Sequence, residues 1–194
     1  MSALPGPAAA ADPGVALLER ALAYTRSTLA TVTPAHLCLP TPCDRWRLGD
    51  LLAHMEDSLD AFAEGALGTI GLHSAAPAPL DERITALQTK ACGLLGAWSA
   101  ATTDVVEVGG QPMAVGTITR LAALEIAVHG WDVGRTTDAG LPLPEAFARD
   151  LLPTALALAI EHDGEFGPAV PVPADAGPER RLLALLGRRS LPRR

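Results

Sequence analysis

The chain is poor in lysine, in aromatic residues and in cysteine. Lys90 is the single lysine among 15 basic residues, and this preference for arginine, with abundant alanine, glycine and proline, is typical of a GC-rich bacterial genome. Aromatic residues make up 4% of the chain, whereas hydrophobic residues make up 48%. The core must therefore consist of leucine, alanine and valine, a composition that favours helices over sheets.

The few cysteines exclude two classes of small domain. Cys38, Cys43 and Cys92 are odd in number and form no CxxC pair, so neither a disulfide framework nor a zinc ribbon is expected. The N-terminal segment has no basic region followed by a long apolar run, and we predict no signal peptide. No stretch reaches the roughly 18 uncharged apolar residues of a membrane span. The sequence predicts a cytoplasmic protein.

Positive charge is also scarce. The net charge of −7 and the pI near 5.1 argue against nucleic acid or a membrane as a partner. The one dense basic run comprises Arg188, Arg189, Arg193 and Arg194. We interpret it as a solvated, frayed end rather than a binding site.

The length of 194 residues fits one domain. We expect a disordered N-terminus over residues 1–12, a single helical domain over 13–189 and a frayed tail over 190–194. Hydrophobic periodicity predicts helices over 13–33, 47–65, 116–136, 145–162 and 179–187, and one beginning near residue 81. The segment "DVVEVGGQPMAV" favours a short hairpin or extended crossover. The fold class is all-α: a four-helix bundle with this crossover between its third and fourth helices, and extra C-terminal helices.

One predicted helix, "LAALEIAVHGWDVGR" over residues 121–135, carries polar groups on an apolar face. Glu125 and His129 are four residues apart and project to the same side. A buried carboxylate costs several kcal/mol unless a partner neutralises it. A metal ion would neutralise Glu125 and also bind the imidazole. This pair of ligand types suits zinc or another first-row divalent metal.

A third ligand must come from another helix. Of the five histidines, His54 alone lies in the middle of a long predicted helix. It sits on the flank of the leucine stripe, on a row with Leu51 and Ser58, where small side chains would let a neighbouring helix approach. The pattern permits His54 as a ligand without proving it.

Two motifs carry a resemblance to a known family. "TPCDRWRLGDLLAHM" contains Thr41, Pro42, Cys43, Trp46, Leu51, Leu52 and His54, and "LEIAVHGWDVGRTT" contains Glu125, His129, Gly130, Trp131 and Asp132. In this order they resemble the DinB-like superfamily and, within it, the mycothiol-dependent maleylpyruvate isomerase N-terminal-like proteins. The C-terminal "FGPAVPVPADAGPERRLLALLGR" looks like the uncharacterised single-domain members. The resemblance extends from about residue 15 to 189.

The resemblance implies a DinB-like bundle with a divalent metal on His54, Glu125 and His129. Three protein ligands leave a position for water or a substrate thiolate. Family members use such a metal to bind a low-molecular-weight thiol as thiolate, for transfer to an electrophile or for isomerisation. The characterised isomerases also carry a second, C-terminal domain, for which this chain is too short.

Several residues keep a structural alternative. Glu125 could instead form an ion pair with Arg120 or Arg135. Asp132 could orient a ligand imidazole or pair with Arg135 three residues later, and we favour the structural role. For Trp46 and Trp131 we favour a role in packing. For Cys43 we favour a structural role in fixing the loop, and the alternative is that its thiol is a nucleophile or a metal ligand.

The function we predict is metal-dependent thiol chemistry on a small-molecule substrate, with a mycothiol-like thiol as cosubstrate and a metal-bound thiol or water as nucleophile. Zinc is the expected metal, with nickel, iron and manganese as alternatives. A second hypothesis keeps the metal but uses water, for hydrolysis or a Lewis-acid rearrangement. A third is a non-catalytic binding or stress-response bundle that the metal stabilises. The sequence leaves open whether the protein is a monomer or a homodimer.

Overall fold

A computed structural model describes residues 12–43, 46–67, 76–108, 110–161 and 166–189. Its elements follow one another as α1 (Pro13–Leu29), the 3-10 helix η1 (Pro34–His36), α2 (Leu48–Gly65), α3 (Leu80–Ala100), β1 (Val105–Val108), β2 (Gln111–Ala114), α4 (Val115–Thr136), α5 (Glu145–Glu161) and α6 (Pro178–Leu185). None of the helices described is long and apolar enough to cross a membrane.

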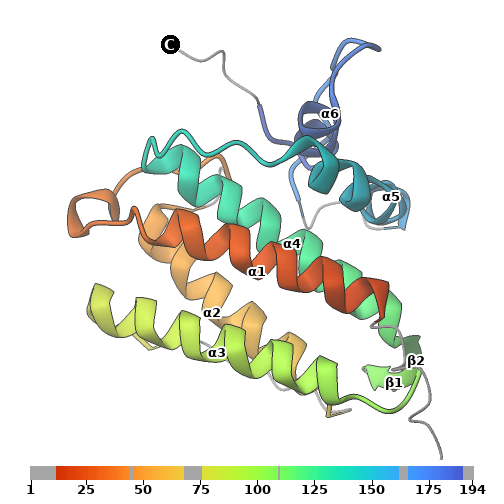
Figure 1. Cartoon of the computed structure of the whole chain (residues 1–194). Coiled ribbons are helices and arrows are strands. Elements are labelled where there is room, and N and C mark those ends of the chain that lie inside the picture. The colour runs from red at the N-terminus through yellow and green to blue at the C-terminus, as the bar shows by residue number, and fades with distance from the viewer. Residues whose placement is uncertain (1–11, 44–45, 68–75, 109, 162–165, 190–194) are drawn as a thin grey trace, which may run out of the picture.

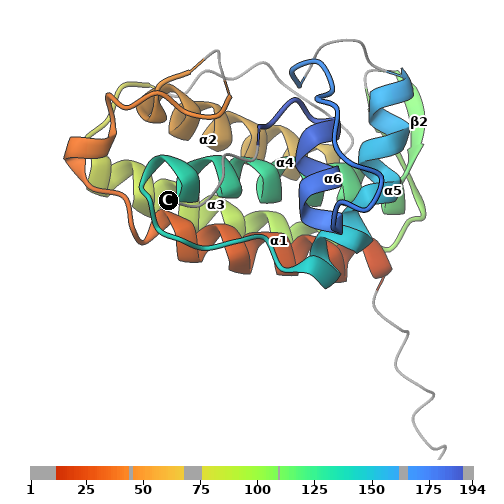
Figure 2. The ribbon, with the colours of Figure 1, turned by 90° about the horizontal axis from the view of Figure 1, so that it is seen from above.

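Helices α1 to α4 run lengthwise beside one another as a bundle (Figure 1). The antiparallel hairpin of β1 and β2, with Val105 opposite Ala114, lies at one end. Helices α5 and α6 pack together on the side of the bundle away from α3 (Figure 2). The predicted all-α bundle, its hairpin and its extra C-terminal helices are therefore confirmed.

The predicted helix boundaries agree with the structure to within a residue or two, except at the end of α1. This helix ends at Leu29 rather than at Thr33. The hydroxyl of Thr31 donates to the carbonyl of Thr28, a local bond that competes with helical pairing. Thr33 is extended because it precedes Pro34, and a residue before proline avoids the helical region.

The predicted termini fall mostly outside the described residues. Residues 1–11 of the expected disordered segment and the expected frayed tail, 190–194, are not part of the description. Asp12 belongs to the fold, because its carboxylate accepts a hydrogen bond of 2.6 Å from the backbone N–H of Gly14 and caps α1.

Ion pairs, one of them largely buried, fasten α3 to α2. The guanidinium of Arg83, which is 7% exposed, donates to Glu56 at 2.7 Å. The ammonium of Lys90 lies 3.0 Å from Glu56 and 2.5 Å from Asp60. These contacts hold α3 beside α2. The apolar face of α3 is left to pack in the interior of the bundle.

Helices α1 and α4 approach so closely that a side chain at Gly130 would not fit. A Cβ atom there would lie 2.2 Å from Oγ1 of Thr25 and 3.1 Å from its Cα. The hydroxyl of Thr25 donates to the carbonyl of Ile126 at 2.8 Å, which ties the two helices together. The glycine of the "HGWD" motif thus fixes the position of α4, from which two candidate ligands project.

Gly130→Ala should lower the free energy of unfolding by about 1–3 kcal/mol, because overpacking forces the two helices apart. Gly96→Ala on α3 is the matched control, since its Cβ would meet nothing within 4 Å, and helix propensity should raise stability there by up to about 1 kcal/mol. Urea denaturation measures both. Equal effects of the two substitutions would contradict the close approach.

Candidate metal centre

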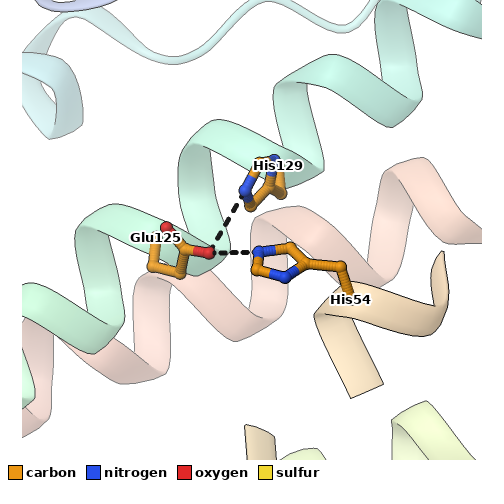
Figure 3. Close-up of side chains that lie close together, drawn as sticks. All are labelled: His54, Glu125 and His129. Atoms are coloured by element: carbon orange, nitrogen blue, oxygen red, sulfur yellow. Dashed lines mark hydrogen bonds and ion pairs between the residues drawn. The ribbon is translucent and has the colours of Figure 1, made fainter. Parts of the chain in front are cut away.

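His54 of α2 meets Glu125 and His129 of α4 at one point inside the bundle (Figure 3). Oε1 of Glu125 lies 2.8 Å from Nε2 of His54 and 3.1 Å from Nε2 of His129. One donor atom from each residue falls within 4.8 Å of the others. The structure therefore brings together all three residues that the sequence singled out as metal ligands.

The three side chains differ in exposure. The imidazole of His129 is 3% exposed, the carboxylate of Glu125 19% and the imidazole of His54 32%. The flank position of His54 on the leucine stripe explains its partial exposure. Ser58, one turn further along α2, places its hydroxyl 3.4 Å from Nε2 of His54 and 3.5 Å from Oε1 of Glu125.

The carboxylate of Glu125 is compensated by imidazoles rather than by an arginine. Its ion pairs within the described part of the chain are those with His54 and His129. The guanidinium of Arg135, one alternative partner, lies instead over the ring of Trp131, 5.8 Å from its centroid. Trp131 is 4% exposed, in line with its predicted packing role.

Mutual charge sets the protonation of this cluster. Burial opposes ionisation of Glu125, but His129 and His54 beside it hold the pKa of the carboxyl well below its usual range. Burial likewise opposes a charged His129, yet Glu125 and then Asp132 raise the pKa of its imidazole to about 9. Without a metal, the buried site is a carboxylate beside a protonated imidazole.

Asp132 lies behind His129 and contacts it directly. Oδ2 of the fully buried Asp132 is 3.0 Å from Nδ1 of His129. An ionised carboxylate can only accept, so Nδ1 carries the hydrogen and Nε2 faces Glu125. The expected ion pair of Asp132 with Arg135 does not form; Asp132 pairs with Arg188, whose Nη2 lies 2.8 Å from Oδ2.

Arg188 corrects the interpretation of the basic tail. It is 2% exposed, not solvated, because the chain turns back at Gly187, where φ is +77°. The backbone N–H of Arg188 donates to the carbonyl of Leu183, and the backbone N–H of Gly187 donates to the carbonyl of Ala184. These two bonds form a Schellman motif at the end of α6. A glycine following "LLALL" was the sequence signal for this turn, but nothing in the sequence indicated that the next side chain points inward.

Aromatic rings surround the cluster in a way that the sequence did not reveal. The ring of Trp46 stacks on His54 with centroids 4.3 Å apart. Phe166 lies 6.1 Å from the ring of His129 and carries the guanidinium of Arg188 over its own ring. Trp46, predicted only to pack, contacts a candidate ligand. Cys43 stands in the turn before it, where its carbonyl accepts a hydrogen bond from the N–H of Trp46.

A cavity of about 370 Å³ opens beside the cluster. Glu125, Ile126 and His129 of α4 form part of its wall, and the remaining wall comes from α1, α2 and α3. A small molecule inside it would reach two of the three candidate ligands. The arrangement can therefore hold a divalent cation and present it to a bound substrate.

Comparison with known proteins bears on the family and the fold. The family model described as mycothiol maleylpyruvate isomerase N-terminal domain matches residues 18–134, which include the three candidate ligands and Asp132 but not Arg188. The match confirms the resemblance inferred from the two motifs. None of the curated proteins matches the chain.

Two solved structures share the fold. One is the crystal structure of a histidine-to-alanine mutant of the mycothiol-dependent maleylpyruvate isomerase, with a TM-score of 0.57 and 15% identity over 81% of this chain and 69% of that one. The other, of the mycothiol-dependent maleylpyruvate isomerase, has a TM-score of 0.51 and 19% identity over 80% of this chain and 70% of that one. These likenesses confirm the predicted DinB-like bundle.

Arg188→Met should lower the free energy of unfolding by about 3–5 kcal/mol, because it leaves the buried carboxylate of Asp132 without its cation. Arg189→Met is the matched control, since Arg189 is exposed and its loss should cost at most about 0.5 kcal/mol. Thermal and urea denaturation measure both. A loss at Arg188 no larger than at Arg189 would show that Asp132 does not depend on the pair.

The metal-free protein should lose stability as the pH rises from 6.5 to 9. Below pH 6.5, His129 is protonated in both states; between 6.5 and its folded pKa of about 9 only the folded state keeps the proton. The unfolded state then binds fewer protons, so the free energy of unfolding falls with pH, by about 3 kcal/mol in total. Urea denaturation in EDTA should show this slope, and His129→Gln should flatten it; parallel slopes would contradict the assignment.

Proposed function

Because the chain belongs to the mycothiol maleylpyruvate isomerase N-terminal domain family, we propose that it is a metal-dependent enzyme of thiol chemistry. It transfers a low-molecular-weight thiol such as mycothiol to a small electrophile, or uses the thiol to assist an isomerisation. The observation that carries the proposal is the convergence of His54, Glu125 and His129 on one point in the wall of a cavity.

The donor set fits a divalent metal. Tetrahedral ligands about 2.1 Å from zinc are roughly 3.4 Å apart. Oε1 of Glu125 is 2.8 Å from Nε2 of His54 and 3.1 Å from Nε2 of His129, both close to that spacing, and one donor atom from each residue lies within 4.8 Å of the others. Two imidazoles and a carboxylate suit zinc first, with nickel, iron or manganese as alternatives. The cluster of described residues has three members, which supports a site with an open position rather than a closed structural one.

A metal held by these residues would lower the pKa of a bound thiol and so supply a thiolate at neutral pH. The protein's own contribution is orientation. Asp132 accepts the Nδ1 hydrogen of His129 and leaves Nε2 directed at the site, and Trp46 stacks on His54 and restricts the tilt of its ring. The apolar cavity excludes water that would compete with the thiol.

A cytoplasmic location is also part of the proposal. Cys38 and Cys92 are free thiols, and both are exposed. Exposed thiols persist where the surroundings are reducing, which is also where a low-molecular-weight thiol is available in its reduced form.

Metal content tests the proposal first. Elemental mass spectrometry on the untagged protein should find close to one divalent metal per chain, and His54→Ala and His129→Ala should each lose most of it. His36→Ala is the matched control, because Nδ1 of His36 accepts a hydrogen bond from the backbone N–H of Thr33 and His36 is not a member of the cluster. Metal absent from the wild-type protein even after reconstitution would contradict the proposal.

A thiol titration separates the catalytic proposal from a purely structural metal. With cobalt in the site, addition of a low-molecular-weight thiol should produce a sulfur-to-cobalt charge-transfer band in the near ultraviolet. A stoichiometric metal whose spectrum does not respond to thiols would instead support the non-catalytic bundle.

A further inference from the structure

The cavity beside the candidate ligands has a largely apolar wall. Every helix of the four-helix bundle contributes, and the aliphatic and thioether side chains are Leu22, Ala23, Leu29, Met55, Leu59, Leu87, Ala91, Leu95 and Ile126. Its volume of about 370 Å³ lies at the lower end of the range of roughly 300–1,000 Å³ that small-molecule pockets occupy. The space is large enough for a compact ligand.

Polar groups are confined to the two ends of the cavity. Glu125, His129 and Ser58 stand at the inner end. Glu19, Arg26, Gln88 and Cys92, all exposed, stand at the mouth. The hydroxyl of Thr25, which also lines the cavity, is already donated to the carbonyl of Ile126. Between the two ends, a ligand meets hydrocarbon.

We propose that this cavity selects an electrophile with an apolar body and at most one charged group, that group remaining at the mouth beside Arg26. This inference rests on the proposed function, since it names the substrate class of the same site. In the transfer, a sulfur electron pair forms the new C–S bond, the leaving anion departs with the electrons of the bond that breaks, and the thiol proton passes to solvent.

The charges of the wall support the limit to one charged group. Arg26 and His129 are the basic side chains among the described residues of the lining, and Glu19 and Glu125 are acidic. His129 is already paired with Glu125, Nε2 to Oε1, at 3.1 Å, which leaves Arg26 as the basic partner for a ligand. A carboxylate pushed to the middle of the cavity would lose its hydration with only hydrocarbon around it. A second carboxylate at the inner end would stand beside that of Glu125. An apolar body loses nothing at either place and gains from leaving water.

The test is a binding series that needs no catalysis. 1-Octanol, octanoate and octanedioate have the same number of carbons and carry no charge, one charge and two charges. Isothermal titration calorimetry is run on the protein as purified and after EDTA treatment. In the metal-free protein, octanol and octanoate should bind, and octanedioate should bind at least tenfold more weakly than octanoate. Octanedioate binding as tightly as octanoate, or no binding of octanol, would overturn the inference.

Substitutions locate the ligand in the cavity. Ala91→Trp places an indole in the lining and should weaken octanol binding at least tenfold, whereas Thr89→Trp, exposed on the same helix and outside the lining, should leave it unchanged. Circular dichroism establishes that both variants are folded. If Ala91→Trp does not fold, Leu95→Phe in the same lining is the replacement. Octanol binding that no lining substitution weakens would overturn the inference.

The role of Arg26 is tested separately. Arg26→Gln should weaken octanoate several-fold and leave octanol unchanged. Arg20→Gln is the matched control, because Arg20 lies on the same helix, outside the lining, and pairs with Asp150. Equal effects of the two substitutions on octanoate would remove Arg26 from the proposal.

The two proposals fail differently. If the protein binds no metal but the octanol series follows the expected order, the proposed function falls and the apolar selectivity of the cavity stands. If metal and thiol bind as expected but octanedioate is preferred, the function stands and the inference about the substrate falls.

Discussion

The largely buried carboxylate of Glu125, whose side chain is 19% exposed, is the constraint on which the site depends. It projects from α4 into the bundle, and the two imidazoles that compensate it must come from fixed positions, His129 one turn along the same helix and His54 on α2. A single oxygen contacts both rings, so the three donor atoms surround a space of the size of one ion. Protons can satisfy this arrangement in the metal-free protein, and a divalent cation satisfies it without leaving a charged imidazole in the interior.

The rest of the structure keeps α4 in place from two sides. On one side, Gly130 lets α1 come within contact of the α4 backbone, and Thr25 bonds to it. On the other, Arg188 reaches Asp132, which in turn holds Nδ1 of His129. The second support comes from a segment outside residues 18–134, the part that the family model matches. In the part of the chain that the structure describes, the C-terminal segment thus reaches the site through the ion pair of Arg188 with Asp132 and the ring contact of Phe166 with His129.

Much of this could be predicted from the sequence, for local reasons. The helices, the hairpin and the pairing of Glu125 with His129 on one face follow from periods of 3.6 and 2 residues, which a sequence displays directly. His54 was identified with help from the family motif, because its flank position does not by itself distinguish a ligand from a surface residue. Arg188 was misjudged because its burial depends on a turn at Gly187 and on the distant Asp132. The contact of Trp46 with His54 is likewise tertiary. Contacts between residues that are distant in sequence cannot be predicted from the local pattern around either residue.

The candidate ligands and most of the cavity wall come from different helices, which bears on how such a bundle could change its substrate. Helices α2 and α4 supply the three candidate ligands, whereas α1 and α3 supply most of the cavity wall. Glu125 and His129 belong both to the candidate metal ligands and to the cavity wall. A small molecule in the cavity therefore lies beside these donor atoms, whichever side chains form the rest of the wall. Apart from Thr25, which bonds to α4, lining side chains on α1 and α3 can therefore vary in size and charge without moving a candidate ligand, because α4 is positioned by the contacts at Gly130 and by Asp132. Under the proposed function, reaction chemistry and substrate choice would then be set by different residues of the same four helices.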